Sequence, residues 1–226
     1  MKSQIRTWLA SAAFDRIEDA AIKDDYVIGT LIRLTYDADP LICWRSIDAI
    51  GRCAQRLAGI RMECLKTYLR RLFWMMSDES GSIAWRAPEI IVEIIRADPH
   101  ALADFIPMTV SLLDMEPEDL AEFLPGILYA LGRIGEISPD SVMGSLRRIL
   151  DAADHKDGEV CAMALSCLGR LSAFGLVSRY PGLWQDERKV TVYRCEQLAE
   201  ITIRELVHEL SRCSVHISSA ILEPDL

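Results

Sequence analysis

The sequence lacks the features of a membrane protein and those of a nucleic-acid-binding protein. No window approaches the run of about 20 uninterrupted apolar residues that a membrane-spanning helix needs. Residues 1–22 lack the long apolar core of a signal peptide. Lys and Arg total 25 against 34 Asp and Glu, which gives a formal net charge of −9. Because phosphate binding needs clustered Lys and Arg, we expect no nucleic-acid partner, and no membrane partner either.

Motifs for catalysis, nucleotide binding and metal binding are also missing. GxSxG, GxxxxGK[ST] and GxGxxG do not occur, so no nucleophile elbow, P-loop or dinucleotide loop is expected. The four histidines form neither HxxxH nor HExxH, and His208 and His216 have no suitably spaced Cys or Asp partner. The sequence therefore predicts no catalytic residue, no metal and no cofactor.

The cysteines are seven, an odd number, and they form no CxxC pair. They lie within apolar helical runs, which is typical of free, buried thiols in a reducing compartment. The cytoplasm is therefore the expected location. Half of the 226 residues are hydrophobic and the mean hydropathy is +0.14, so the chain can bury a core without disulfide or metal help. This balance fits a well-filled core or an apolar interface left for a partner.

What the sequence does contain is a repeat. Four segments align without gaps: WRSIDAIGR, WRAPEIIVE, PGILYALGR and AMALSCLGR. Their last residues, at positions 52, 93, 133 and 170, are 41, 40 and 37 residues apart, the period of a two-helix repeat. Each segment has apolar residues at helical spacing. The first helix of each hairpin is expected before it, at residues 25–36, 61–76, 102–113 and 141–153. A single helix over residues 3–21 is expected to cap the open end of the stack.

The beginnings of these second helices also recur. Asp39 precedes Pro40, which is typical of an N-cap followed by proline at the first helical position. Ser80 and Asp157 occupy the equivalent positions in the second and fourth repeats. In the third repeat a helix start near residue 117 or 119 is expected.

A glycine recurs near the end of three of the four segments, as Gly51, Gly132 and Gly169. Glycine costs a helix about 1 kcal/mol relative to alanine. A close helix crossing at this position would explain its recurrence. Val92 takes the position in the second repeat, where a wider crossing is expected.

With these repeated segments, the chain resembles HEAT-repeat proteins, in particular the bacterial PBS-lyase-like HEAT repeats. The resemblance covers roughly residues 24–175 and rests on the Asp-x5-[Arg/Met] spacing, the Trp-Arg pair and the A-[IL]-G-R stretch. It implies an all-α, right-handed α-α superhelix, a HEAT/armadillo-like solenoid of about four helical hairpins. The expected parts are a capping helix (1–22), repeats (23–176, at about 24–59, 60–98, 101–137 and 139–176) and a non-repeat extension (177–226).

The extension departs from the repeat. Beta-branched residues on both sides of the polar stretch Cys195-Glu196-Gln197 predict a small β-hairpin, with one continuous helix over 188–212 as the alternative. Thr202 and Glu205 have the spacing of a capping box, so a helix is expected from Ile203 to about residue 213, followed by a tail. The apolar composition and this extension together lead us to expect a homodimer.

The candidate binding residues lie on the second helices, opposite the apolar stripe, where they would face the concave surface. They are Asp48, Arg52, Glu89, Glu93, Tyr129, Arg133, Ser166 and Arg170. One interpretation is structural: a ladder of ion pairs from Arg52 through Glu93 to Arg133. The other is a mixed-charge groove with Tyr129 as an aromatic anchor. Since no acidic residue of the set separates Arg133 from Arg170, that end is the better candidate for an acidic peptide or carboxylate.

The aromatic residues allow two interpretations as well. Trp44 and Trp85 share one repeat position, which favours a buried contact between hairpins over an aromatic wall for a ligand. The stretch Phe73 to Met76 is expected to be buried rather than to form a protein-binding patch.

The favoured function is a non-catalytic protein-interaction scaffold or adaptor that binds a protein partner on its concave face. The PBS-lyase-like resemblance implies the alternative, a lyase or an accessory protein of cofactor attachment. A nucleic-acid-binding HEAT protein is a third possibility, which the acidic charge balance disfavours.

Overall fold

The computed structural model describes residues 1–76, 85–115 and 117–221, without the side chains of 117–120 and 213–221. Its helices are α1 (Lys2–Ala10), α2 (Phe14–Lys23), α3 (Tyr26–Leu34), α4 (Pro40–Ala58), α5 (Met62–Met76), α6 (Ala87–Ile95), α7 (Phe105–Val110), α8 (Pro117–Gly135), α9 (Pro139–Met143), α10 (Leu146–Ala152), α11 (Gly158–Arg170) and α12 (Ile203–Ile221). Three 3-10 helices and two strands complete the described chain: η1 (Ser111–Asp114), η2 (Phe174–Arg179), η3 (Pro181–Gln185), β1 (Lys189–Arg194) and β2 (Gln197–Thr202).

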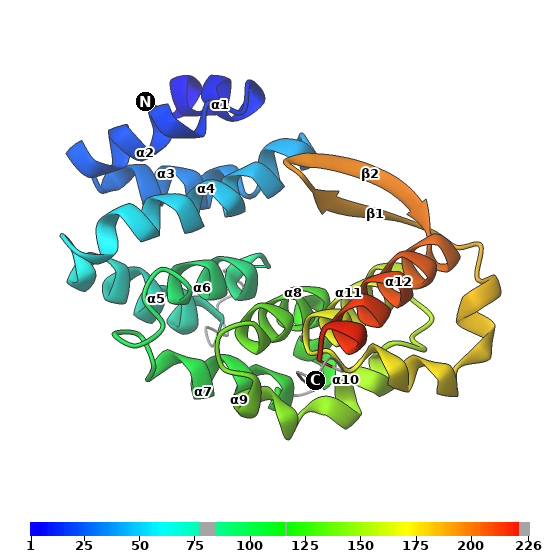
Figure 1. Cartoon of the computed structure of the whole chain (residues 1–226). Coiled ribbons are helices and arrows are strands. Elements are labelled where there is room, and N and C mark those ends of the chain that lie inside the picture. Colours follow the sequence, from blue (N-terminus) through cyan, green and yellow to red (C-terminus); the bar gives the residue numbers. More distant parts are fainter. Residues whose placement is uncertain (77–84, 116, 222–226) are drawn as a thin grey trace.

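The helices form a stack of hairpins that curves into an arc (Figure 1). The second helices α4, α6, α8 and α11 pack side by side in chain order, and α12 continues the row. All nine residues of α6, in the middle of this row, are buried. The expected all-α repeat stack with a small C-terminal hairpin is therefore confirmed.

The predicted helix starts are confirmed in the first, third and fourth repeats. The Asp39 carboxylate accepts a 2.9 Å hydrogen bond from the backbone N–H of Leu41 at the start of α4. Asp157 accepts one of 2.8 Å from the N–H of Glu159 at the start of α11. Such bonds satisfy N–H groups that have no partner inside the helix. Helix α8 begins at residue 117, as expected. The start predicted after Ser80 is wrong, because α6 begins only at Ala87 with Arg86 as its N-cap. Ser80 itself lies outside the described residues.

The recurrent glycines lie at close crossings between neighbouring helices, as predicted. A Cβ atom on Gly51 would lie 3.3 Å from the Cβ of Glu93 on α6, and one on Gly132 would lie 3.1 Å from the Cα of Cys167 on α11. On Gly169 it would lie 3.0 Å from a methyl group of Leu210 on α12. Each glycine therefore lets the next helix in the row approach.

The single opening helix expected over residues 3–21 is wrong. The chain forms two helices, α1 and α2, and Ala12 between them has φ 52, in the left-handed region. Arg45 accounts for the break, because its guanidinium donates 2.8 Å hydrogen bonds to the carbonyl oxygens of Leu9 and Ala10. Both carbonyls lie at the end of α1, and the last C=O groups of a helix have no N–H partner within the helix.

The shared position of Trp44 and Trp85 does not give them a shared environment. Trp44 is 7% exposed, as expected, whereas Trp85 is 56% exposed. Since α6 begins only at Ala87, Trp85 lies in the preceding turn and not on the helix. The expected burial of residues 73–76 is also wrong for Trp74, which is 63% exposed. Phe73 next to it stacks on Phe105, with ring centroids 6.2 Å apart.

The C-terminal β-hairpin is confirmed, with β1 and β2 antiparallel in the register Arg194↔Gln197 to Lys189↔Thr202. Its two-residue turn, Cys195 and Glu196, has φ 48 and φ 62, as the turns that match the twist of a hairpin require. Cys195 is exposed, contrary to the expectation of buried thiols.

The capping box at the start of α12 is confirmed as well. The N–H of Thr202 donates to the Glu205 carboxylate at 2.8 Å, and the N–H of Glu205 donates to the Thr202 hydroxyl at 3.2 Å. Helix α12 continues to residue 221, beyond the expected end near 213, because residues 214–221 contain neither glycine nor proline to break it.

Candidate functional site

The eight predicted residues lie on α4, α6, α8 and α11, the second helices of the four hairpins. We call the side of this row on which Asp48, Tyr129 and Arg170 lie the inner face. The β-hairpin extends from α12 back to α4 and crosses the inner face (Figure 1). The predicted residues are therefore not all open to a partner.

At the α4 end, the hairpin covers the predicted residues. Arg52 donates to the Asp48 carboxylate at 3.1 Å and to the Glu196 carboxylate of the hairpin turn at 2.6 Å. The Tyr193 hydroxyl donates to Asp48 at 3.2 Å. The predicted pairing of Arg52 with Glu93 is thus replaced by contacts with Asp48 and the hairpin, so this end binds part of its own chain.

Two further contacts hold the hairpin on α4. The Tyr193 ring stacks on Trp44, with centroids 5.6 Å apart and an interplanar angle of 10°. Arg45, which is 3% exposed, donates through Nε to the Glu196 carbonyl at 3.0 Å. Two consecutive non-glycine residues in the left-handed region are held by surrounding contacts such as these. The hairpin turn is therefore an integral part of the inner face.

In the middle of the row, Glu93 is the centre of a polar cluster. It is 6% exposed and accepts hydrogen bonds of 2.8 Å from the Tyr129 hydroxyl, from Arg133 Nε and from Arg96. The Glu93–Arg133 step of the predicted ladder is therefore present.

Glu136, which is not one of the predicted residues, joins Arg133 and Arg170. It pairs with Arg133 at 2.7 Å, with Arg170, and with Arg96 at 3.7 Å. An acidic residue outside the predicted set therefore lies between Arg133 and Arg170. The i,i+3 spacing of Arg133 and Glu136 could have indicated this pair, since such residues are neighbours on a helix surface.

Glu89 does not belong to the surface at all, contrary to the prediction. It is 1% exposed, and one carboxylate oxygen accepts a 2.9 Å hydrogen bond from Arg86. The other oxygen has no hydrogen-bond partner among the described residues and lies against Gly126, where a Cβ would collide with it. Burial raises the pKa of Glu89, although the Arg86 charge opposes this effect.

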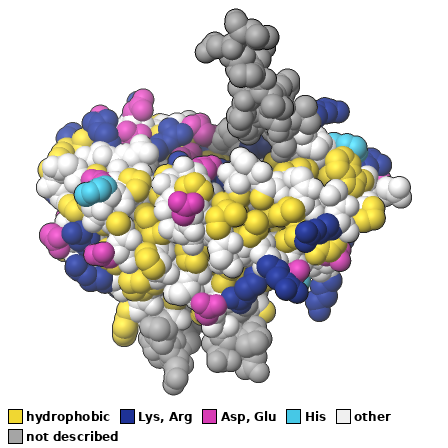
Figure 2. Space-filling view, turned by 60° about the horizontal axis from the view of Figure 1, so that its bottom comes forward, with side chains coloured by type: hydrophobic (Ala, Val, Ile, Leu, Met, Phe, Trp, Pro, Cys, Tyr) yellow, Lys and Arg dark blue, Asp and Glu magenta, His cyan; other side chains and the backbone are white. Residues whose placement is uncertain are grey.

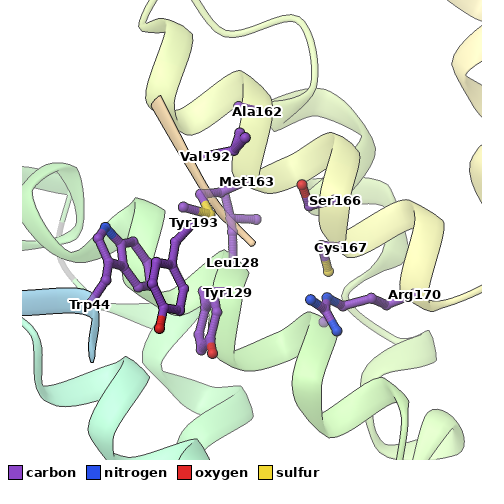
Figure 3. Close-up of a pocket in the computed structure, with 11 residues that line it drawn as sticks. Trp44, Leu128, Tyr129, Ala162, Met163, Ser166, Cys167, Arg170, Val192 and Tyr193 are labelled. Atoms are coloured by element: carbon purple, nitrogen blue, oxygen red, sulfur yellow. The ribbon is translucent and has the colours of Figure 1, made fainter. Parts of the chain in front are cut away.

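A small cavity of about 70 Å³ lies between α8, α11 and β1 (Figure 3). Leu128, Met163 and Val192 give it apolar walls, and Trp44, Tyr129 and Tyr193 gather at one side. Ser166 and Arg170 of α11 supply polar groups at the other side. Of the eight predicted residues, the structure thus brings Tyr129, Ser166 and Arg170 together.

The tyrosine hydroxyls of this cavity act as hydrogen-bond donors. Burial raises the pKa of Tyr129 well above its ordinary value, and the neighbouring Glu93 charge raises it further. Burial and the Asp48 charge raise the pKa of Tyr193. Both hydroxyls consequently stay protonated near neutral pH, which suits positioning rather than proton abstraction.

Other features of the described residues bear on the possible function. No helix among them is long and apolar enough to cross a bilayer. In the same part of the chain, no three His, Cys, Asp or Glu side chains come together in a way that could hold a metal ion.

Comparisons with known proteins support the fold and leave the family open. No family model matches the chain. A protein of Archaeoglobus fulgidus, described as uncharacterized, is 26% identical over 184 residues, which are 80% of this chain and 93% of that protein. The resemblance to PBS-lyase-like HEAT repeats is shown by none of the comparisons.

Among solved structures, the chain is similar to a designed armadillo repeat protein in complex with the peptide (KR)4. The TM-score is 0.50 at 15% identity, over 94% of this chain and 97% of that one. An archaeal HEAT-like repeats protein from Thermococcus onnurineus has a TM-score of 0.39 at 15% identity, over 96% and 98% of the two chains. The first similarity supports an armadillo/HEAT-type repeat fold for this chain.

Proposed function

We propose that the chain is a non-catalytic adaptor that binds a segment of a protein partner on its inner face. The observation that carries this proposal is the cavity between α8, α11 and β1. It combines apolar walls with the polar groups of Ser166 and Arg170 in the part of the inner face that the hairpin leaves open. Apolar pockets with a few convergent polar groups are typical binding sites.

The charges around this cavity favour an acidic partner segment. Two carboxylates, those of Glu93 and Glu136, pair with the three guanidinium groups of Arg96, Arg133 and Arg170. The formal net charge of these five side chains is therefore +1. Burial raises the pKa of Glu93 and works against its negative charge. We therefore propose a segment that places an apolar side chain in the cavity and an acidic group beside Arg170.

The fold similarity is compatible with such a role. A designed armadillo repeat protein of similar fold is known in complex with the peptide (KR)4. That peptide is basic, whereas the charges beside this cavity favour an acidic one. Stacked hairpins offer an extended surface to a partner without any need for a catalytic pocket.

The test uses variants that change the cavity and leave the hydrogen-bond donors of buried Glu93 in place. Ser166→Trp fills the cavity and Arg170→Gln removes its charge, whereas Tyr129 is left intact because its hydroxyl bonds to buried Glu93. Arg147→Gln, on the exposed surface of α10, is the matched control. Each full-length protein is immobilised and exposed to an extract of the source organism, and bound proteins are identified by mass spectrometry.

We expect the wild type and the Arg147→Gln control to retain a common partner that both cavity variants lose. Melting temperatures of all four proteins establish that the variants are folded. Full recovery of that partner by folded Ser166→Trp would contradict the proposed site.

We also propose a cytoplasmic location. Support comes from the free thiols of Cys43, Cys53, Cys161 and Cys167, all of them buried, since such cysteines are typical of reducing compartments.

A homodimer is a further proposal, and the support is exposed apolar surface. Hydrophobic side chains gather across the middle of the face shown in Figure 2. On adjacent helices α7 and α9, Met108 is 45% exposed and Met143 is 50% exposed. Light scattering at high micromolar concentration should give the mass of a dimer, and a monomer mass would remove this proposal.

A further inference from the structure

A second cavity lies between α3 and α5, the first helices of the first two hairpins. Its volume is about 240 Å³, and it shares no lining residue with the inner-face cavity. Ile32, Leu72 and Met75 give it an apolar lining, joined by the rings of Tyr36 and Tyr68. Gly29, Arg33 and Arg71 complete the lining, and both arginines are exposed.

The space between the two helices is held open by a specific contact. The Tyr68 hydroxyl on α5 donates a 3.3 Å hydrogen bond to the carbonyl of Asp25, at the start of α3. It also lies next to Gly29, where a Cβ would be 3.2 Å from the hydroxyl oxygen. Tyr68 therefore spaces α3 from α5, and the glycine leaves room for its hydroxyl, so the cavity is already formed without a ligand.

The two arginines lack acidic partners in the part of the chain that the structure describes. Arg33 donates only to the neutral hydroxyl of Thr30, at 3.0 Å. The nearby Arg61 and Arg70, by contrast, each lie within 4 Å of a carboxylate. In a chain with nine more acidic than basic side chains, two unpaired arginines at one apolar cavity define a site for a negative charge.

We propose that this cavity binds a small organic anion with an apolar body, such as a medium-chain carboxylate. The apolar body lies over Ile32, Leu72 and Met75, and the carboxylate accepts hydrogen bonds from Arg33 and Arg71. A cation is disfavoured by the two guanidinium groups, and inorganic phosphate would leave the apolar lining unused. The volume lies just below the usual range for ligand pockets, about 300–1,000 Å³, which favours a small molecule.

The test is isothermal titration calorimetry of the full chain with sodium octanoate, octylammonium chloride and 1-octanol, all below micelle-forming concentrations. We expect saturable binding of one octanoate per chain, weaker binding of octanol, and the weakest binding of octylammonium. Replacing both arginines, Arg33→Gln with Arg71→Gln, should lower the affinity for octanoate by about tenfold or more, as expected for lost charge-assisted hydrogen bonds. Arg70→Gln, next to Arg71 on α5, is the matched control and should bind octanoate like the wild type.

Two-dimensional NMR of the labelled wild type locates the ligand independently of any variant. Octanoate should shift the amide resonance of Gly29 and the methyl resonance of Met75, and should leave those of Ser166 and Arg170 in place. Three results would overturn the proposal: no saturable octanoate binding, equal affinity for octylammonium, or shifts confined to residues outside this cavity. Because the two cavities share no residue, failure here leaves the adaptor proposal standing, and the reverse also holds.

Discussion

The crossing of α8 and α11 at Gly132 makes a sharp test of how the repeat is packed. A Cβ on Gly132 would lie 3.1 Å from the Cα of Cys167 and 3.0 Å from the Cδ of Arg170. The Arg170 side chain can move, but the Cα of Cys167 belongs to the α11 backbone, which can only yield if the helix shifts. The substitution Gly132→Leu therefore forces the two helices apart or the new side chain into a strained rotamer.

The expected change in the free energy of unfolding is the difference between two opposing effects. Replacing glycine within a helix gains about 1 kcal/mol of helix propensity, whereas overpacking typically costs about 1–3 kcal/mol and can cost more. Leucine places four carbon atoms where even the first has no room, so we expect an overpacking cost of about 3 kcal/mol. Subtracting the gain in helix propensity leaves a net loss of unfolding free energy of about 2 kcal/mol. For a chain of this size that corresponds to a melting temperature lower by about 4–8 °C.

The assay is urea and thermal unfolding followed by circular dichroism, with Gly59→Ala as the control. Gly59 has φ −76, and a Cβ there would meet nothing within 4 Å, so alanine should stabilise the chain by about 0.4–1 kcal/mol. If Gly132→Leu unfolds at the same urea concentration as the wild type, the crossing is not close and the packing described above is wrong.

Three further predictions concern the polar core, the hairpin and the fold. Burial raises the pKa of Glu89, so its contribution to stability is fully present below the ordinary pKa and is lost as the pH rises through the raised value. Glu89→Gln should therefore remove a stability decrease above about pH 4.5 in urea unfolding. Tyr193→Phe, which keeps the stacking on Trp44, should cost about 1 kcal/mol in urea unfolding for its lost hydrogen bond, and Tyr193→Ala about 1 kcal/mol more for the lost ring contact; equal stability of both with Tyr26→Ala, at a 72% exposed residue, would show that the hairpin does not stabilise the stack. Circular dichroism of the wild type should be dominated by helix, well above the one-third of an average protein, and a β-rich spectrum would rule out the architecture.

Several polar residues of α4 and α6 hold distant parts of the chain together. Arg45 ends α1 and anchors the hairpin turn, Arg52 joins α4 to Glu196, and Glu93 joins α6 to α8. In a stack in which each hairpin contacts only its neighbours, a hairpin that connects the last helix to α4 adds a long-range link. The inner-face cavity next to β1 is bordered by this same β-hairpin.

The local sequence was sufficient for the helical repeat, for three of the helix caps and for the β-hairpin. The repeat period of about 40 residues, the N-caps Asp39 and Asp157, and the capping box of Thr202 and Glu205 depend on residues a few positions apart. Those interactions form in the same way wherever the segment lies in the fold. Gly132 and its equivalents Gly51 and Gly169 likewise indicated close helix crossings. Glycine lowers helix stability, so its recurrence at one repeat position points to a place where a larger side chain would not fit.

Only the tertiary structure decided which of the predicted residues are open to a partner. Periodicity predicts the face of a helix on which a side chain lies, but nothing in it indicates what covers that face. The Arg52–Glu196 pair joins residues 144 positions apart, and the bonds from Arg45 to α1 and to the hairpin span 35 to 151 positions. The split of the opening helix, the occupied α4 end and the burial of Glu89 all follow from contacts between distant segments. Such contacts leave no local pattern because each depends on how the whole row of helices curves.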